Sequence, residues 1–324
     1  MAYDLEFEKP LAELEKKMGA LQKKGERLKP DEHRQLQEME RELRSRSEEL
    51  YRDLTAWQTV QVARHKERPH SLDYLRLITD DFFELCGDRA FSDDHAILGG
   101  LAQFNGETVM FVCHQKGRTM KDKQYYNNGM PRPEGFRKAR RLMKQAEKFG
   151  IPVVTLIDTQ GAFPALEDEE RGQAQAIAAS ILEMARLRIP SLAVVIGEGG
   201  SGGALALGVT DRVLITEFSI YTVISPESAA SILWRSTSFA QEAANAMRIS
   251  GRELKKLGLV DDVIPEPPGG AHHNPSQAAE NLKAAIQRHL AELKQIPLDE
   301  LLELRYQKYR SIGEFSWADD GVQG

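Results

Sequence analysis

The residues most able to do chemistry form a glycine-rich stretch at 197–203, with the sequence Gly-Glu-Gly-Gly-Ser-Gly-Gly. It follows the apolar run 191–196, so we expect it at the end of a β-strand. Two known patterns overlap in it, because 197–202 fits the GxGxxG dinucleotide fingerprint and 199–203 fits the GxSxG nucleophile elbow of hydrolases. At most one of these interpretations applies to a single turn of the chain.

A dinucleotide site needs a strand, the glycine turn and a helix, followed by an acidic residue about 20 positions on. Glu217 lies 20 residues after Gly197, near the end of the next predicted strand. However, only residues 204–211 separate the glycine stretch from that strand, which is about two helical turns and short for a right-handed crossover. This spacing weighs against a dinucleotide site.

A serine nucleophile at Ser201 needs a histidine base and an acid nearby. His272, His273 and His289 follow it in the chain, and nothing in their spacing selects one of them as the base. The phosphate-binding pattern Gly-x-x-x-x-Gly-Lys-Ser/Thr does not occur in the sequence, so no ATP site of that type is predicted.

A third interpretation of the glycine stretch uses only its backbone. Consecutive glycines at a strand-to-helix junction present adjacent N–H groups, and the positive end of the helix adds to their attraction for a developing negative oxygen. Glycine suits this role because it has no Cβ to block the approach of a thioester or ureido carbonyl. The stretch is therefore a candidate oxyanion hole.

The elements that must position this stretch alternate between strands and helices from about residue 70. Two long amphipathic segments, 133–149 and 169–187, predict helices. Apolar, β-branched segments predict strands at 96–104, 108–113, 153–157, 192–196, 212–216 and 221–224. The alternation is typical of an α/β protein, and a Pro/Gly-rich segment ends it before a helical tail at 276–309.

An N-terminal arm is predicted over residues 10–57, as two helical stretches separated by Gly25 and Pro30. Its second stretch carries an apolar stripe formed by Leu36, Met39, Leu43, Leu50, Leu54 and Trp57. Such a stripe predicts burial, but it leaves open whether the arm packs on its own core or on another subunit.

Composition bounds the class of protein. The chain has 324 residues, 41% of them hydrophobic, and a formal net charge of −6, so it can bury a full α/β core and gives no overall reason to expect nucleic acid. Cys86 and Cys113 lie far apart, so neither a disulfide framework nor a zinc site is predicted. Without a membrane-length apolar run or a signal-like N-terminus, a cytoplasmic protein is expected.

The glycine stretch is one of seven short sequence motifs that occur in a fixed order along the chain. The motifs are His-Gln-Lys-Gly-Arg (114–118), Pro-Glu-Gly-Phe-Arg-Lys-Ala (133–139), Ile-Asp-Thr-Gln-Gly-Ala-Phe-Pro (157–164), Glu-Glu-Arg-Gly-Gln (169–173), Val-Ile-Gly-Glu-Gly-Gly-Ser-Gly-Gly-Ala (195–204), Ile-Ser-Pro-Glu (224–227) and Glu-Pro-Pro-Gly-Gly-Ala-His (266–272). In order and spacing they resemble the α subunits of bacterial acetyl-CoA carboxylase carboxyltransferases, over nearly the whole chain except its last dozen residues.

This resemblance implies an α/β fold of the crotonase-like (ClpP/crotonase) type, built from repeated ββα units. It divides the chain into an N-terminal helical arm at 1–62, a carboxyltransferase domain at 63–310 and a C-terminal tail at 311–324. It also implies transfer of a carboxyl group from carboxybiotin to acetyl-CoA, which gives malonyl-CoA in the first committed step of fatty acid synthesis.

The resemblance further implies partners. Biotin would arrive on a separate biotin carboxyl carrier protein, carboxylated by biotin carboxylase, and a carboxyltransferase β subunit would complete the site in an α2β2 assembly. No covalently bound biotin, no metal and no ATP site are expected in this chain. Neither a membrane nor nucleic acid is an expected partner.

The resemblance assigns the oxyanion hole for carboxybiotin to the backbone N–H groups of Gly202 and Gly203. Once the carboxyl group leaves, the ureido nitrogen of biotin is basic enough to take the methyl proton of acetyl-CoA, so no side-chain base is required. Gly203→Val is expected to abolish transfer and to leave subunit association intact. The expected substrate-binding residues are Gly161, Ala162, Phe163, Gly199, Gly200, Lys116 and Arg118.

Residues 114–148 hold eleven Lys or Arg and only three Asp or Glu, although the chain as a whole is acidic. The phosphates of coenzyme A would be attracted by Lys116, Arg118, Lys121 and Lys123. Alternatively, this run of charges is a solvent-exposed face that binds no ligand. Nucleic acid is the outside alternative for this segment.

The sequence departs from the family pattern at Tyr126, Asn128, Gln160, Ala165 and Ser228. Ala165 stands where glycine is usual and is expected to restrict a turn. The changes at 126–128 and 228 leave open a non-catalytic interaction subunit that keeps the fold without binding substrate. A second alternative is a stand-alone crotonase-fold acyl-CoA enzyme, either a decarboxylase or a hydratase.

Overall fold

The computed structural model describes residues 3–25 and 29–313, and within them lies one mixed sheet of eight strands. The strands are β1 (Asp81–Glu84), β2 (Ile97–Phe104), β3 (Glu107–His114), β4 (Val153–Thr159), β5 (Ser191–Gly200), β6 (Arg212–Thr216), β7 (Ile220–Thr222) and β8 (Asp262–Ile264). All six predicted strands are present. β1 and β8, which are short and only partly buried, were not predicted.

The strand order is β1-β2-β3-β4-β5-β6-β8, with β7 beside the end of β5. The strands from β3 through β8 pair in parallel, whereas β2 pairs antiparallel with both β1 and β3. The pairing of β7 places Glu198 opposite Ile220 and Gly200 opposite Thr222. The carboxyl ends of β3, β4 and β5 therefore open at one edge of the sheet, where parallel sheets commonly bind ligands.

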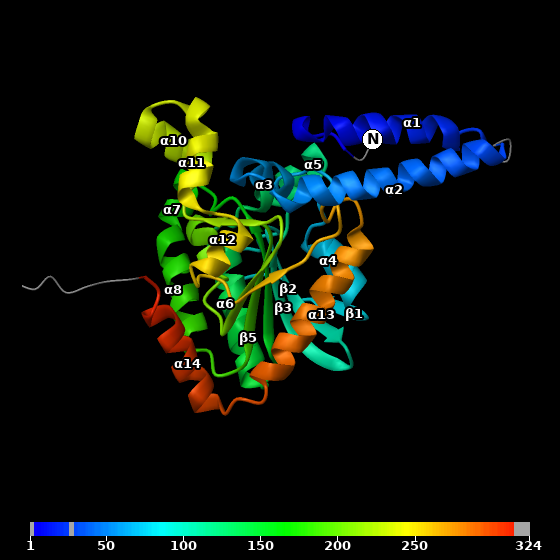
Figure 1. The fold of residues 1–324 in the computed structure, drawn as a ribbon. Coiled ribbons are helices and arrows are strands. Elements are labelled where there is room, and N and C mark those ends of the chain that lie inside the picture. Colours follow the sequence, from blue (N-terminus) through cyan, green and yellow to red (C-terminus); the bar gives the residue numbers. More distant parts are fainter. Residues whose placement is uncertain (1–2, 26–28, 314–324) are drawn as a thin grey trace, which may run out of the picture.

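Helices cover both faces of this sheet (Figure 1). On β4, Val154 and Leu156 pack in one hydrophobic cluster, while Val153 and Ile157 pack in another, as expected when successive side chains point to opposite faces. The first cluster includes side chains of α4 (Ser71–Ile78) and α13 (Pro275–Leu293). The second includes those of α6 (Pro133–Lys148) and α8 (Gln173–Arg186).

Two predicted helical segments are each broken into two helices. The segment 169–187 is divided between α7 (Leu166–Glu170) and α8, because Gly172 between them has a left-handed φ of 81°. The tail is divided between α13 and α14 (Leu298–Arg310), with Pro297 directly before α14. A proline has no N–H to continue a preceding helix, so the chain turns there.

The remaining helices are mostly short. They are η1 (Glu6–Glu8), α1 (Lys9–Gln22), α2 (Pro30–Arg52), α3 (Ala56–Ala63), α5 (Met120–Tyr125), η3 (Asn127–Gly129), α9 (Ser201–Leu205), α10 (Pro226–Trp234), η4 (Thr237–Phe239), α11 (Ala240–Met247) and α12 (Gly251–Lys256). No helix of the described residues has the length and apolarity that a bilayer span requires.

The predicted N-terminal arm is present as α1 and α2, which lie side by side and extend beyond the body of the molecule (Figure 1). Near the end of α2, Tyr51 packs edge-to-face on Phe218, with ring centroids 5.2 Å apart. Leu43, Leu50 and Leu54 of the predicted stripe join the same cluster. This end of the stripe therefore packs on the chain's own core, and a contact of the arm with another subunit stays a prediction.

The connection from β5 to β6 differs from the expectation. Residues 204–211 looked too short for a crossover, yet β5 and β6 are parallel neighbours, with Leu192 opposite Arg212. The five residues of α9 and a short turn suffice because β6 starts level with the beginning of β5. The length of this segment therefore does not argue against a parallel β-α-β unit.

Candidate active site

The glycine stretch forms the junction between β5 and α9. Gly199 and Gly200 are the last residues of β5, and Ser201 then turns the chain with φ = 53°, a value uncommon for a residue with a side chain. Gly202 and Gly203 belong to the first turn of α9, where backbone N–H groups have no partner within the helix. These two N–H groups are the ones that the sequence predicted for an oxyanion hole.

Glycine is required at this junction because backbone from the end of β4 lies directly behind it. A Cβ on Gly203 would lie 2.6 Å from the carbonyl carbon of Gly161 and 2.8 Å from the nitrogen of Ala162. A Cβ on Gly200 would lie 2.2 Å from the carbonyl oxygen of Gln160. Gly203→Val would therefore disturb the packing of the junction itself, so loss of transfer in this variant would not report on the oxyanion hole alone.

The loop that follows β4 is held in place by hydrogen bonds from three directions. The hydroxyl of Thr159 accepts from the N–H of Gly161 at 3.0 Å and donates to its carbonyl oxygen at 2.8 Å. The N–H of Phe163 donates to the carbonyl of Pro131 at 2.9 Å. The amide of Gln173 donates to both Pro131 and Phe163, each at 3.0 Å. The predicted residues at 161–163 are thus fixed beside Gly203.

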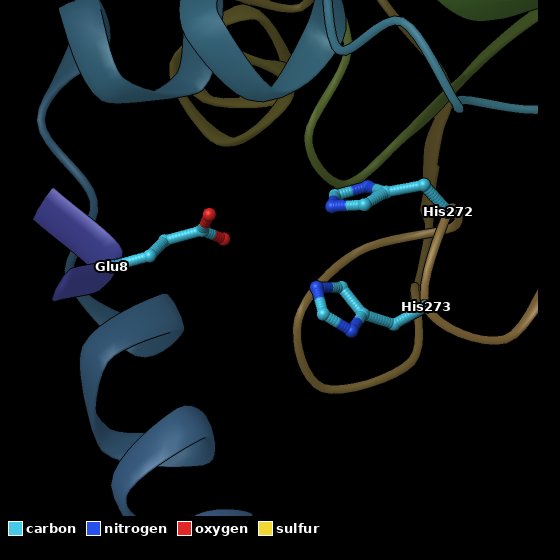
Figure 2. A group of neighbouring side chains, drawn as sticks. All are labelled: Glu8, His272 and His273. Carbon is cyan, nitrogen blue, oxygen red and sulfur yellow. The ribbon is translucent and has the colours of Figure 1, made fainter. Parts of the chain in front are cut away.

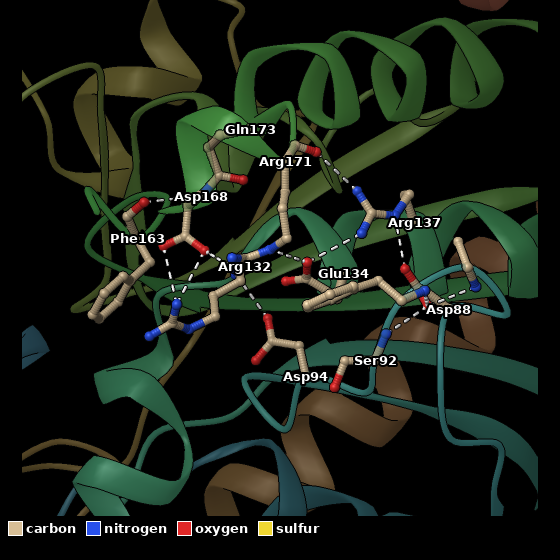
Figure 3. Close-up of polar contacts among 12 residues, drawn as sticks. Asp88, Ser92, Asp94, Arg132, Glu134, Arg137, Phe163, Asp168, Arg171 and Gln173 are labelled. Atoms are coloured by element: carbon tan, nitrogen blue, oxygen red, sulfur yellow. Dashed lines mark hydrogen bonds and ion pairs between the residues drawn. The ribbon is translucent and has the colours of Figure 1, made fainter. Parts of the chain in front are cut away.

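A network of ion pairs supports this loop from below (Figure 3). The guanidinium of Arg132 lies over the ring of Phe163, 4.4 Å from its centroid, and contacts the carboxylate of Asp168 at 3.1 Å. Arg171 joins Asp168 to Glu134, at 2.5 and 2.6 Å. Both carboxylates are buried and paired with arginine, so the network gives the loop a rigid base.

A second line of charges crosses the carboxyl ends of β3, β4 and β5. The ammonium of Lys116, just after β3, lies 2.8 Å from Asp158 Oδ1 on β4 and 3.0 Å from Glu198 Oε1 on β5. Arg64 at the end of α3 lies 2.7 Å from the other oxygen of Glu198 and 2.5 Å from Glu227 on α10. Five alternating charges thus tie five segments together beside the glycine stretch.

The charges in this line are mutually stabilised. Burial raises the pKa of Asp158, but Lys116 and His70 outweigh burial and hold that pKa well below its usual range. Burial also opposes ionisation of Glu198, and Lys116 and Arg64 lower its pKa nonetheless. The pKa of Lys116 is lowered by burial and raised further by its two carboxylates, so the net shift is upward. All three groups are therefore charged at neutral pH.

Two polar pockets open along this line and share Arg64, Gln160 and Glu198 in their walls. One, of about 310 Å³, includes Gly199 and Gly200. The other, of about 200 Å³, holds six Lys or Arg and two acidic residues: Arg64, Lys66, Arg68, Lys116, Arg118 and Lys123, with Asp158 and Glu198. The second pocket is therefore basic, and its chemistry suits an anionic ligand.

Most of the cations in the basic pocket have internal partners. Arg118 contacts Asp73 at 2.8 Å, and Arg68 forms a buried pair with Glu266 at 2.5 Å. Lys123 is exposed at the rim, and among the ion pairs of residues 3–25 and 29–313 none involves its ammonium. Lys116 and Arg118, which were predicted to bind substrate, both line this pocket, whereas Lys123 is its one cation without an ion pair among the described residues.

A third pocket, of about 340 Å³, is lined by the start of α9 and is mainly apolar. Ser201 and Gly202 line it together with Leu205, Tyr221 and Tyr309. The predicted site residues are therefore distributed around one junction: Gly199 and Gly200 face a polar pocket, Gly202 faces the apolar one, and residues 161–163 lie behind Gly203.

The dinucleotide and serine-nucleophile interpretations of the glycine stretch find no support in these contacts. The carboxylate of Glu217 accepts hydrogen bonds from Arg252 at 2.5 Å and from the N–H of Glu266 at 3.2 Å. Among the hydrogen bonds of the described residues, none joins Ser201 to a histidine. His114 is fully buried, and burial lowers its pKa to about 3, which keeps the ring neutral.

Four members of the charge line were not predicted. Asp158, Glu198 and Glu227 lie in the sequence motifs at 157–164, 195–204 and 224–227, but none of them was assigned a role. Arg64 had no signal, because its partner Glu198 is 134 positions away in the chain. The available clue was an acidic residue at the end of each of two neighbouring parallel strands.

The departures from the family pattern fall at different places. Asn128 and Gln160 line the basic pocket, and Tyr126 packs edgewise on Tyr125. Ser228 belongs to the cap of α10, where its N–H donates to the hydroxyl of Ser225 at 3.1 Å. Ala165 has φ = −111°, an extended conformation open to any residue, so the expected restriction of a turn is wrong.

Residues 4–313 match the family described as acetyl co-enzyme A carboxylase carboxyltransferase-like. The chain is 50% identical over 314 residues to the acetyl-coenzyme A carboxylase carboxyl transferase subunit alpha of Stenotrophomonas maltophilia (strain R551-3), covering 97% of this chain and 98% of that protein. It is 51% identical over 311 residues to the subunit of the same name from Xanthomonas axonopodis pv. citri (strain 306), covering 96% and 98%.

Solved structures share the fold at lower identity. A Pseudomonas malonate decarboxylase hetero-tetramer in complex with coenzyme A has a TM-score of 0.59 at 17% identity, covering 74% of this chain and 94% of that chain. Transcarboxylase 12S has a TM-score of 0.52 at 22% identity, covering 66% and 41%. The crotonase-like α/β fold expected from the sequence is confirmed. The chain belongs to the acetyl-coenzyme A carboxylase carboxyltransferase family.

Proposed function

We propose that this chain is the α subunit of an acetyl-CoA carboxylase carboxyltransferase and moves a carboxyl group from carboxybiotin to acetyl-CoA, giving malonyl-CoA. Its relatives at about half identity over nearly their whole length carry that name. The proposal includes a β subunit in a cytoplasmic α2β2 assembly, a biotin carboxyl carrier protein that delivers the substrate, and a biotin carboxylase that loads it.

The observation that carries the proposal is the pair of N–H groups at the start of α9. Gly202 and Gly203 present them without side chains, at the edge where the parallel strands end. They would donate to the ureido oxygen of carboxybiotin as negative charge develops there. Each such donor contributes about 2.7–4 kcal/mol of transition-state stabilisation.

The reaction then balances without a side-chain base. The bond between the ureido nitrogen and the carboxyl carbon breaks and releases CO₂, and the electron pair stays on the nitrogen. That nitrogen takes a proton from the methyl group of acetyl-CoA, and the resulting enolate carbon bonds to CO₂. The cationic Lys116 and the buried His114 are poorly suited to act as the base, which agrees with this route.

The basic pocket is the proposed contact for the phosphates of coenzyme A. It lies along the same sheet edge as the glycine junction and shares Gln160 and Glu198 with the pocket that Gly199 and Gly200 line. Lys123 would meet a phosphate at the rim. Lys116 would instead hold Asp158 and Glu198, and through them the ends of β4 and β5.

The first test is malonyl-CoA-dependent carboxylation of free biotin. The chain is assayed alone and then after mixing with a carboxyltransferase β subunit from a close relative. Activity only in the mixture supports the α-subunit proposal. Activity of the isolated chain favours a stand-alone acyl-CoA enzyme, whereas a stable but inactive complex favours an interaction subunit.

A further inference from the structure

A carboxylate and two imidazoles from distant parts of the chain meet where the N-terminal arm joins the body. Glu8 ends η1, and His272 and His273 lie in the loop between β8 and α13. Figure 2 shows the carboxylate of Glu8 pointing toward both rings from the opposite side. One oxygen of Glu8 and one nitrogen of each histidine all lie within 4.8 Å of one another.

The two imidazoles have unused nitrogen atoms. Both ring nitrogens of His272 and Nε2 of His273 are buried and have no hydrogen-bond partner among the described residues. Both rings contact another ring: His272 stacks on His65 with centroids 3.8 Å apart, and His273 lies tilted against Tyr3 with centroids 4.1 Å apart. Buried polar atoms without partners are rare in native proteins and call for an explanation.

Glu8 is a buried carboxylate that lacks a cationic partner among the described residues. Its side chain is fully buried, and its oxygens accept hydrogen bonds from the hydroxyl of Tyr51 and from the N–H of Leu5, the latter at 2.9 Å. Among the ion pairs formed within residues 3–25 and 29–313, none gives Glu8 a cationic partner. A buried carboxylate without a compensating charge is costly, and a cation between it and the two histidines would supply that charge.

We propose that Glu8, His272 and His273 form a binding site for one divalent transition-metal ion of the zinc class. Two nitrogen donors and one carboxylate are the ligand types that Zn²⁺ accepts, whereas Mg²⁺ and Ca²⁺ prefer oxygen alone. A tetrahedral ion with bonds of about 2.0–2.1 Å needs its ligand atoms about 3.4 Å apart, so the side chains close slightly on binding. The fourth position is open to water. This departs from the expectation that the chain carries no metal.

The neighbouring groups fit such a site. Tyr51 and the N–H of Leu5 orient the carboxylate, which is the usual role of hydrogen bonds around a metal ligand. Each carboxylate oxygen has lone pairs beyond those used in these bonds. The ion would tie η1 of the arm to the loop that also carries Glu266, the partner of buried Arg68. Its role is therefore structural, because it fastens the arm to the body.

The test uses the full chain without a histidine tag, stripped of metal and titrated with Co²⁺, whose visible absorption reports a four-coordinate site. We expect one equivalent to bind with intense absorption that Zn²⁺ abolishes by displacement. Glu8→Gln and His273→Gln should each weaken Co²⁺ binding about 100-fold or more, since even loss of a hydrogen bond to a ligand costs 10–100-fold. His33→Gln, on the exposed face of α2, is the matched control and should bind normally.

Thermal unfolding gives an independent measurement. Zn²⁺ should raise the unfolding midpoint of the unchanged chain and of His33→Gln but not that of Glu8→Gln, because only a chain that binds the ion gains stability from it. Circular dichroism checks that each variant is folded. Weak Co²⁺ binding that is the same in all four proteins would overturn the proposal. Intense absorption that persists in both Glu8→Gln and His273→Gln would overturn it equally.

Discussion

Gly203 lies back to back with Gly161, so that a Cβ on Gly203 would be 2.6 Å from the Gly161 carbonyl carbon. Gly203→Ala should therefore destabilise the chain by about 1–3 kcal/mol through overpacking. Gly202→Ala should cost much less, because its Cβ would meet Ile177 at an ordinary 3.5 Å. Urea unfolding of both variants checks this difference, and equal stabilities would contradict the packing argument.

Gly202→Ala also tests the oxyanion hole, because the fold should tolerate it. Its methyl group would stand beside the N–H groups at the start of α9 and push the substrate carbonyl away. A displacement of about 1 Å typically costs about 100-fold in rate. The kcat of the reconstituted carboxyltransferase should fall accordingly, with little change in association with the β subunit. An unchanged kcat would remove the N–H groups of this turn from the mechanism.

Lys116→Met should strongly destabilise the chain. It leaves Asp158 without its nearest cation and Glu198 with Arg64 alone, both carboxylates being buried. Breaking a buried pair in this way costs about 3–5 kcal/mol. Lys121→Met, an exposed change on α5, is the control and should be nearly neutral. The free energy of unfolding in urea at pH 7 measures both effects, and a neutral Lys116→Met would show that the charge line is not a stabilising network.

His114 should make stability depend on pH. Burial lowers its pKa from 6.5 to about 3 in the folded chain, so between these values the unfolded chain binds more protons. Stability is therefore complete above pH 6.5 and is lost as the pH falls toward 3. At pH 5 the loss from this group is about 2 kcal/mol. His114→Leu should lack this part of the decline between pH 7.5 and pH 5 in urea unfolding, whereas an identical decline would exclude His114 as its source.

Lys123→Ala should weaken the use of acetyl-CoA without slowing the chemistry. An exposed contact to a phosphate is worth at most about 1 kcal/mol, so KM should rise about two- to fivefold while kcat stays the same. The difference should shrink at high salt. Lys121→Ala is matched in type, helix and exposure but does not line the pocket. The same rise in KM for Lys121→Ala would point to the general charge of α5 instead.

Much of the local structure was determined by the sequence. The alternating apolar segments predicted six of the eight strands of the described sheet, and the glycine stretch was correctly expected at a strand-to-helix junction. These features follow from backbone geometry and from the two-residue period of a strand, which neighbouring residues carry on their own. The order of the seven sequence motifs also identified the family.

The tertiary structure alone decided how the site is held and why its glycines are needed. Lys116 was predicted from its charge to meet a ligand, but its ammonium is paired with Asp158 and Glu198. Arg64 reaches Glu198 across 134 residues, and Glu8 meets His272 and His273 across most of the chain. Such contacts depend on which distant segments the fold packs together and on how deeply it buries them. Neither the packing of distant segments nor their depth of burial can be predicted from a local sequence pattern.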